Sequence, residues 1–265
     1  MAEDWTMPKG ELMKGKRGVV MGVANDHSIA WGISKQLALQ GAELAFTYQG
    51  DALAKRVRPL VESIGQKLMV PADVTDDASM DTAFATIKET WGSIDFLVHA
   101  IAFASRDALT YPYYETSRAD FLQAMEISVY SLVALCQHAL PHLAHGACIL
   151  TLTYLGSVRM VPGYNVMGVC KAALESSVRY LAAELGRAKN VRVNALSAGP
   201  LRTLSSAGVT GFSKILDHYP TKAPLARNVE GGEVGKSGLY LLSDLSSGVT
   251  GEVHYVDAGY SIIGW

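Results

Sequence analysis

The stretch TLTYLGSVRMVPGYNVMGVCK, from Thr151 to Lys171, decides the fold of this chain. It begins in an apolar run, Cys148 to Leu152, which predicts the end of a buried strand. A loop containing Pro162 and Gly163 follows, and a helical pattern begins near Tyr164. A buried strand that leads through a loop into a helix is the repeating unit of an α/β fold, and the same order recurs on both sides of this stretch.

Two side chains in the stretch, Tyr164 and Lys171, stand seven positions apart. In a helix this is two turns, so both would lie on nearly the same face, about 10 Å apart along the axis. A long side chain leans toward the helix N-terminus, so the lysine can reach back toward the phenol. A phenol beside an ammonium is suited to hold a developing oxyanion. A tyrosine and a lysine also share ordinary solvated helix faces by chance, so other features of the chain are needed to tell a functional pair from a chance one.

Size, charge and cysteine usage limit the class of protein. The 265 residues fit one large α/β domain, and we expect a single domain over 1–265. A net charge of −2 without a basic tract argues against nucleic acid or an anionic membrane as partner. The chain shows no secretory signal, and its longest apolar stretch, Ile127 to Cys136, is too short for a bilayer, so we expect a cytoplasmic protein. No metal site is expected, because three cysteines lie in apolar patterns without metal-like spacing: Cys136, Cys148 and Cys170.

Strands and helices alternate along the chain. Apolar runs predict strands at Arg17–Val23, Ala42–Tyr48, Lys67–Val70, Ile94–His99, Ala147–Leu152, Val191–Leu196 and Val253–Val256. Helical patterns lie at Ile29–Leu39, Asp51–Ile64, Asp76–Trp91, Phe121–Leu143, Tyr164–Ala188 and Val229–Leu242. Strands that are apolar throughout predict a Rossmann-type, doubly wound parallel sheet of seven strands with helices on both faces. The longest irregular segment, Ser197–Pro224, predicts a substrate-binding lid over about 197–224.

The segment after the first strand, GVANDHSIAWGI at 22–33, suits the phosphates of a dinucleotide. It departs from G-x-G-x-x-G, but Gly22 ends the strand and Gly32 lies in the first helical turns, where small residues admit a pyrophosphate. Ser28 is placed to cap the helix and to touch phosphate. A plain N-capped helix after a turn explains the segment equally well, so both interpretations stay open.

Residues at the ends of the next strands indicate how a dinucleotide would be recognised. Neutral Gln49 ends the second strand, where such folds read the ribose, and no basic residue follows until Lys55, so NADH is favoured over NADPH. Asp73 follows the third strand, where its carboxylate could accept from an adenine amino group or begin the next helix. His99 ends the fourth strand and is interpreted as a core histidine rather than a base.

These motifs together resemble the NADH-dependent enoyl-acyl-carrier-protein reductases of bacterial fatty-acid synthesis, a divergent branch of the short-chain dehydrogenase/reductases. The resemblance runs from Gly18 to the C-terminus. Its most specific part is Y-x6-K, formed by Tyr164 and Lys171, whereas the wider superfamily has Y-x3-K and this chain has Met167 there. The segments that carry it are GVANDHSIAWGI, AELAFTYQ, ADVTD, HAIAFA, TYLGSVRMVPGYNVMGVCKAALE, VRVNALSAGPLRT and SSGVTGEVHYVDAGYSI.

The resemblance implies roles for single residues. Tyr164 would donate a hydrogen bond to the thioester oxygen as it becomes an enolate, Lys171 would bind the nicotinamide ribose, and Tyr154 would be a second active-site tyrosine. The positions implied to bind the cofactor are Gly22, Ser28, Ile29, Gln49, Asp73, Val74, Ile101, Lys171, Leu201, Arg202, Thr203, Leu204 and Ser205. Those implied to contact the substrate are Ala104, Tyr154, Tyr164 and Met167.

The implied activity is the NADH-dependent reduction of the trans-2 double bond of an enoyl thioester on acyl carrier protein, by a homotetramer. Two features depart from the family's pattern. Ala102 stands where the family often has glycine, and its methyl group would narrow the pocket beside the nicotinamide. Only Arg202 and Lys214 are basic between positions 199 and 217, so few cations would face an acidic carrier protein.

Two other functions stay open at this point. A 3-oxoacyl reductase of the same superfamily would carry a tyrosine and a serine where this chain has Met167 and Thr151. A nucleotide-sensing protein without catalysis would bind NADH and turn over no enoyl thioester. The presence of Tyr154, Tyr164 and Lys171 argues against this second alternative.

Overall fold

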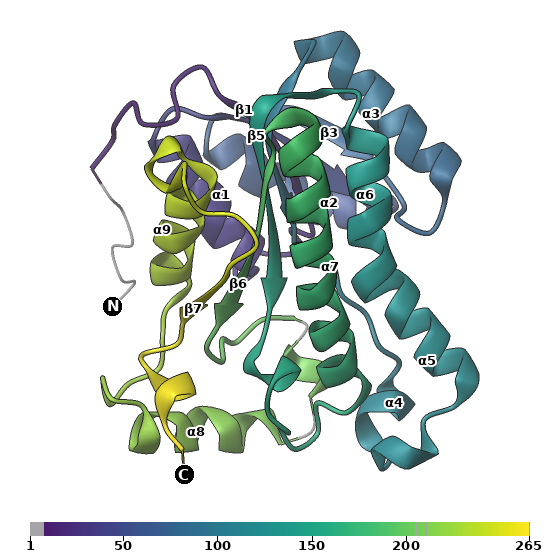
Figure 1. Cartoon of the computed structure of the whole chain (residues 1–265), viewed down its shortest axis with the longest axis vertical. Helices are drawn as coiled ribbons and strands as arrows, with labels where there is room; N and C mark the ends of the chain where they lie inside the picture. Colours follow the sequence, from purple (N-terminus) through teal and green to yellow (C-terminus); the bar gives the residue numbers. More distant parts are fainter. Residues whose placement is uncertain (1–7, 205, 210, 265) are drawn as a thin grey trace.

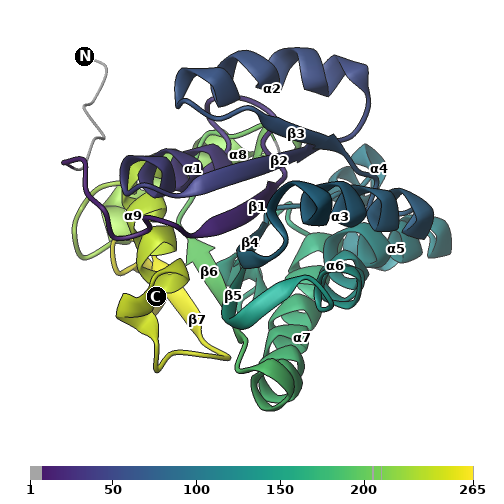
Figure 2. The same cartoon turned by 90° about the horizontal axis from the view of Figure 1, so that it is seen from above.

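A computed structural model describes residues 8–204, 206–209 and 211–264. These residues form one parallel sheet with the strand order β3-β2-β1-β4-β5-β6-β7, and Figure 2 labels all of its strands. The chain starts at the middle of the sheet, winds to one edge and returns to the other half, so the order reverses between β1 and β4. This confirms the predicted doubly wound fold. The strands are β1 Arg17–Met21, β2 Glu43–Tyr48, β3 Leu68–Pro71, β4 Ile94–His99, β5 Leu143–Thr153, β6 Arg192–Ala198 and β7 Val253–Val256.

Helices cover both faces of the sheet (Figure 2). One face carries α1 (Ile29–Leu39), α2 (Asp51–Ser63) and α9 (Gly231–Leu242). The opposite face carries α3 (Asp77–Trp91), α6 (Ser131–Ala139) and α7 (Val166–Lys189). Three further helices lie at the carboxyl end of the sheet: α4 (Arg106–Thr110), α5 (Arg118–Met125) and α8 (Phe212–Lys222). Short 3-10 turns are at Tyr113–Glu115, Leu155–Ser157, Ser206–Gly208, Asp244–Ser246 and Tyr260–Ile262.

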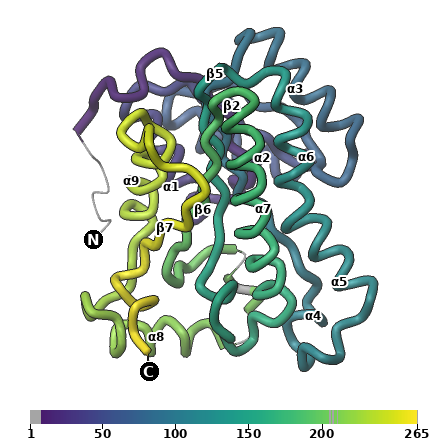
Figure 3. Tube along the Cα trace, viewed as in Figure 1, coloured from purple at the N-terminus to yellow at the C-terminus, as the bar shows by residue number. Residues whose placement is uncertain are grey.

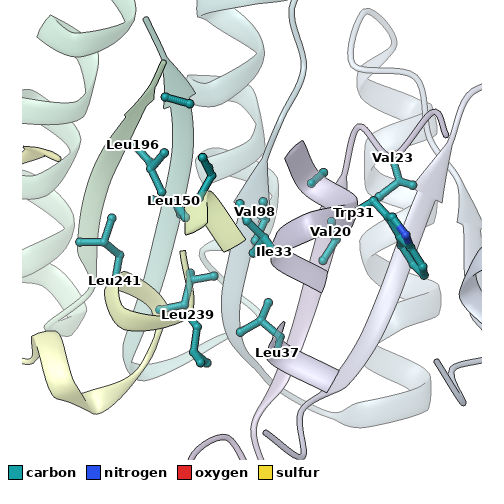
Figure 4. Packing of buried hydrophobic residues seen from close by; sticks show 14 of the residues in the cluster. Val20, Val23, Trp31, Ile33, Leu37, Val98, Leu150, Leu196, Leu239 and Leu241 are labelled. Carbon is teal, nitrogen blue, oxygen red and sulfur yellow. The ribbon is translucent and has the colours of Figure 1, made fainter. Parts of the chain in front are cut away.

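The core is divided by the sheet into two layers. Strand residues alternate between them, so Val20 and Val98 face α1 and α9 (Figure 4), whereas Val19 and Leu97 face α3 and α6. All four are fully buried. Burying one such side chain contributes roughly 1.5–3 kcal/mol. Because both faces are covered, the strands are apolar throughout, which is why simple apolar runs located them.

Glycines allow α1 and α9 to pack closely. A β-carbon on Gly32 would lie 2.7 Å from the carbonyl oxygen of Gly231, and one on Gly235 would lie 2.5 Å from the carbonyl oxygen of Gly32. Gly32 was predicted to make room for a pyrophosphate. It instead makes room for a neighbouring helix, so the phosphate argument for this residue is wrong.

The helix predicted over Phe121–Leu143 is divided in the structure. It begins earlier, as α5, continues through a π-helical turn at Glu126–Tyr130, and ends with α6 at Ala139. Leu143 already belongs to β5, where it pairs with Ile94. Apolar spacing alone could not separate the helix end from the strand start, because both are buried.

The helical run Arg118–Ala139 also meets a length and hydropathy test for a membrane span. It has 22 residues and a mean hydropathy of 1.3, and it is the one run among the described residues that does so. Core helices pass the same test. Its α6 portion supplies Leu132 and Leu135 to the core beneath the sheet.

The segment predicted as irregular, Ser197–Pro224, contains helix α8. Its apolar residues Phe212, Ile215 and Tyr219 recur at helical spacing, a signal that the Gly- and Pro-rich surroundings concealed. Figures 1 and 3 show α8 beside the C-terminal segment, at the carboxyl end of the sheet. The Tyr219 ring stacks on Tyr260 there, with ring centroids 4.1 Å apart and an angle of 11° between the rings.

Candidate active site

A cavity of about 530 Å³ opens at the carboxyl ends of β1, β4, β5 and β6. Doubly wound sheets bind ligands in this place, where the strand order reverses. Residues that follow each of these strands line it, together with the start of α7 and part of α8. A smaller hollow of about 200 Å³ lies beside α4 and α5 and is lined by neither Tyr154, Tyr164 nor Lys171. Among the described residues, no cluster of three or more His, Cys, Asp or Glu side chains is arranged to hold a metal ion.

Most of the predicted site residues meet in the large cavity. Four do not line it: Gln49, Asp73, Val74 and Arg202. Ser205 lies outside the described residues. Those that line it are Gly22, Ser28, Ile29, Ile101, Ala104, Tyr154, Tyr164, Met167, Lys171, Leu201, Thr203 and Leu204.

Gln49 and Asp73 meet each other at the ends of neighbouring strands. The Gln49 Nε2 donates to the Asp73 carboxylate at 2.7 Å. The pKa of Asp73 is lowered, chiefly by hydrogen bonds from the backbone N–H and the hydroxyl of Thr75. The helix that follows is capped by Asp76, which accepts from the N–H groups of Ala78 and Ser79. Asp73 is therefore not the helix-capping aspartate, and its carboxylate stays charged beside Gln49.

The loop after β1 turns sharply at Gly22. Its φ is +98°, and a β-carbon there would overlap the carbonyl oxygen of Ala100, so the position requires glycine. Ser28 stands at the N-cap of α1, but its side chain does not cap the helix. Its Oγ accepts instead from the N–H groups of Ala24 and Asn25, at 3.0 and 3.1 Å. The predicted capping bond is therefore wrong, because the hydroxyl holds the loop together.

Tyr164 lies in a turn before α7, which begins at Val166. The prediction that Tyr164 and Lys171 share a helix face is therefore wrong, although both line the cavity. The rings of Tyr154 and Tyr164 contact edge to face, with centroids 5.0 Å apart and an angle of 72° between the rings. Burial raises the pKa of Tyr154 to about 12 and raises the pKa of Tyr164 further. Both phenols thus remain protonated donors at neutral pH.

Lys171 is almost fully buried, with 6% of its surface exposed. Its Nζ donates to the carbonyl oxygen of Leu152 at 2.8 Å. Burial lowers its pKa to about 8, partly offset by Cys170 and Glu175. Glu175, one turn further along α7, is also buried and accepts from the Thr153 hydroxyl at 2.6 Å. Two bonds therefore join α7 to the end of β5 beneath Tyr154.

His99 belongs to the core, as predicted. Its two ring nitrogens lie 2.9 Å from the hydroxyls of Thr151 and Ser131. Burial lowers its pKa to about 3, so the ring is neutral. It does not line the cavity. The three cysteines are likewise buried, and all are free thiols.

Sequence reasoning missed the part that Ser128 plays. Its hydroxyl accepts from the Phe103 N–H at 2.9 Å and donates to the Phe103 carbonyl at 3.0 Å. The π-helical turn thereby holds the loop after β4, and Phe103 lines the cavity. No local signal joins two residues that lie 25 positions apart and in different elements.

The doubly wound parallel sheet, with its cavity at the point where the strand order reverses, is the Rossmann-type fold of the short-chain dehydrogenases/reductases. The model of one family, described as enoyl-(acyl carrier protein) reductase, matches residues 22–261. The chain belongs to this family, as its motifs predicted.

Individual relatives agree over nearly the whole chain. Enoyl-[acyl-carrier-protein] reductase [NADH] 1 of Rhizobium meliloti is 57% identical over 253 residues, which cover 96% of this chain and 93% of the relative. The structure of the Anaplasma phagocytophilum enoyl-(acyl-carrier-protein) reductase in complex with NAD has a TM-score of 0.94 at 52% identity, covering 98% and 99%. The Bacillus cereus enoyl-acyl carrier protein reductase, solved with NADP+ and indole naphthyridinone, has a TM-score of 0.93 at 50% identity, covering 96% and 100%.

Proposed function

We propose that this protein reduces the trans-2 double bond of an enoyl thioester on acyl carrier protein, with NADH as the reductant. The observation that carries the proposal is the cavity itself. Two partly buried phenols and a buried ammonium line one largely apolar cavity at the reversal point of the sheet, in a chain of the enoyl reductase family. That set of donors suits an oxyanion that forms away from water.

The residues present fit a dinucleotide. Gly22 lines the cavity beside Ser28 and Ile29 at the N-terminus of α1, and a helix N-terminus favours an anion such as a pyrophosphate. The Lys171 ammonium, next to the end of β5, is in place to donate to ribose hydroxyls. Thr203 and Leu201 line the same cavity after β6 and would contact the remaining part of the dinucleotide. Bound NADH supplies the hydride that reaches the β-carbon of the substrate.

The chain's own residues then stabilise the negative charge that moves to the thioester oxygen. Tyr164 donates a hydrogen bond to this oxygen, and its raised pKa keeps the proton in place until the oxyanion has formed. Tyr154 packs against the Tyr164 ring and limits its motion. The Lys171 ammonium, held at the end of β5, adds positive charge that stabilises the oxyanion. The finished enolate is protonated at its α-carbon, from tyrosine or through water.

NADH is proposed over NADPH because of the pair formed by Gln49 and Asp73. Gln49 is neutral, and its amide is held by a carboxylate that would repel a 2′-phosphate. The relative solved with NADP+ makes the comparison of the two cofactors worth measuring. The ratio of kcat/KM for NADH and NADPH is the direct readout.

We propose further that residues 1–265 act as one domain in which about 197–224 form a lid over the substrate. Leu204, Val209 and Phe212 of this segment line the cavity and would exclude water from the acyl chain. Arg202 and Lys214 are exposed on the lid and would meet the acidic carrier protein.

We also propose a cytoplasmic homotetramer. The outer surfaces of α5, the π-helical turn and α7 carry exposed apolar side chains, and these elements contact one another. A second copy of the chain would cover them: Leu122, Tyr130, Val169 and Tyr180. Light scattering on the purified protein measures the oligomeric state, and a monomer would end this part of the proposal.

Spectrophotometric oxidation of NADH tests the activity. Crotonyl and long-chain enoyl thioesters should be reduced, whereas an acetoacetyl thioester should not. Turnover of the acetoacetyl thioester would instead support a 3-oxoacyl reductase. Tight NADH binding without turnover of any enoyl thioester would support a nucleotide-sensing protein.

A further inference from the structure

Asn165, between Tyr164 and the first residue of α7, has an unusual backbone conformation. Its φ is +42° and its ψ is −123°, in a region that favours glycine because a β-carbon crowds the backbone. Unfavourable backbone of this kind persists only where the surroundings enforce it, and it concentrates at functional sites. The position is next to the tyrosine on which the proposed chemistry depends.

The turn at Asn165 sets where the Tyr164 ring lies. The carbonyls of Tyr164 and Asn165 already accept the first bonds of the helix, from the N–H groups of Met167 and Gly168, both at 3.0 Å. The chain must therefore reverse at Asn165, which leaves the Tyr164 ring against Tyr154. The Tyr164 ring also packs on Gly156, where a β-carbon would lie 2.5 Å from a ring carbon.

The Asn165 side chain locks this turn to a different part of the fold. Its Nδ2 donates to the carbonyl oxygen of Tyr111 at 2.9 Å, across a separation of 54 residues. Tyr111 directly follows α4, and Leu109 of that helix lines the cavity. This hydrogen bond, here called the amide clamp, thus joins the turn that carries Tyr164 to the wall of the cavity.

We propose that Asn165 is a positioning residue that holds Tyr164 in its reactive orientation. The backbone turn aims the ring, and the amide clamp keeps the turn closed. The inference rests on the proposed function, because it assigns to Asn165 an effect that passes through the Tyr164 phenol. Aspartate has the same shape but offers an oxygen where the clamp requires a donor, and glycine suits the backbone but has no side chain.

The other end of α7 supplies a matched control. Asn190, the residue that follows the helix, also has a positive φ of 56°. It is exposed and does not line the cavity. Substitutions at Asn190 therefore change an asparagine with positive φ on the same helix without touching the turn at Tyr164.

The experiment compares Asn165→Gly and Asn165→Asp with Asn190→Gly and Asn190→Asp. Steady-state kinetics with NADH and crotonyl thioester should show kcat lowered about 10-fold for Asn165→Gly and about 100-fold for Asn165→Asp. The dissociation constant of NADH should stay within about twofold, since Lys171 and Gly22 are not moved. Both Asn190 variants should keep the kcat of the unchanged protein. Thermal unfolding confirms that each variant is folded, and Asn165→Gly keeps the test decisive if Asn165→Asp does not fold.

A double-mutant cycle shows whether the effect passes through the phenol. In a Tyr164→Phe background, Asn165→Gly should lower kcat by less than about twofold, because no hydroxyl remains to be aimed. An equal loss in both backgrounds, or an unchanged kcat in folded Asn165→Gly, overturns the inference and leaves the proposed function intact. A Tyr164→Phe protein with full activity would instead contradict the role of Tyr164 itself.

Discussion

The Lys171 ammonium lies 2.8 Å from the carbonyl oxygen of Leu152, so a buried charge ties helix α7 to the carboxyl end of strand β5. The Leu152 carbonyl is an uncharged acceptor, so this hydrogen bond does not compensate for the water that the Lys171 ammonium loses on burial. The pKa of Lys171 consequently falls from 10.5 to about 8. Glu175 and Cys170 on the same helix oppose this shift, and neutral His99 lies on the sheet side. Two measurable consequences follow, one for activity and one for stability.

The first prediction concerns activity above neutral pH. Lys171 acts in the proposed mechanism as a cation, so its deprotonation should remove both a ribose donor and a positive charge. We expect kcat/KM for NADH to fall at high pH with an apparent pKa near 8. Lys171→Arg should keep its activity to higher pH, because the guanidinium stays protonated. Its activity should be lower, since a guanidinium differs in shape from an ammonium. An unchanged kcat/KM up to pH 10 would contradict the ribose role.

The second prediction concerns stability over the same range. Between pH 8 and 10.5 the unfolded state keeps the Lys171 proton that the folded state has lost, so the free energy of unfolding rises with pH. The rise from this one group is on the order of 3 kcal/mol. Lys171→Met should be more stable than the unchanged protein at pH 7, and this advantage should shrink by pH 10. Urea unfolding at both pH values measures the difference, and a constant difference would contradict the lowered pKa.

The third prediction concerns the phenol of Tyr164. Tyr164→Phe removes one donor to the oxyanion and should lower kcat about 100- to 1,000-fold. The NADH dissociation constant should be nearly unchanged, because Lys171 and Gly22 remain. Tyr114→Phe, at a tyrosine that is 84% exposed and does not line the cavity, is the matched control and should keep full activity. An equal loss in both variants would point to a general structural effect.

The fold could be predicted because the strands are buried on both faces. Apolar runs such as Ile94–His99 and Val253–Val256 were located to the residue, and Ile29–Leu39 was found by its helical spacing and the glycine that follows. The same reasoning failed where two buried elements meet, as at Leu143, because burial removes the polar residues that mark an end. Helix α8 was missed since turn residues surround its apolar pattern.

The sequence predicted which residues line the candidate site, but not how these residues are arranged. Tyr164 and Lys171 meet in the cavity, yet not along a helix face, because the chain reverses at Asn165. A positive φ at asparagine leaves no pattern in a single sequence. The bond between Gln49 and Asp73 was equally hidden, since the two ends come together only through the pairing of β2 and β3.

A further prediction concerns the glycine turn after β1. Gly22→Ala places a β-carbon against the carbonyl of Ala100 and forces alanine to a φ of +98°. We expect loss of NADH binding and a destabilisation larger than the roughly 1 kcal/mol that alanine typically costs at a positive φ alone. Gly65→Ala is the control, because Gly65 has a φ of +75° and open space around it. NADH titration and thermal unfolding of both variants separate the two effects. Equal stability losses, or intact NADH binding in Gly22→Ala, would contradict the close approach.

The last prediction concerns the choice between the two nicotinamide cofactors. Gln49→Arg would place a guanidinium at the end of β2, where the 2′-phosphate of NADPH is expected, and it would pair with Asp73. That pairing would divert the arginine, so the single change should raise kcat/KM for NADPH only a few-fold. In Gln49→Arg with Asp73→Asn the carboxylate charge is gone, and the gain should be larger than the product of the two single effects.

The comparison of single and double variants makes this prediction specific to the hydrogen-bonded pair. If Asp73 did not influence the cofactor site, Asp73→Asn would leave the NADH to NADPH ratio unchanged and the two substitutions would act independently. Arg56→Gln serves as a control for distant charge, since Arg56 is exposed on α2, seven positions after Gln49. A preference for NADPH in the unchanged protein would refute the argument from neutral Gln49, because it would place the 2′-phosphate contact elsewhere.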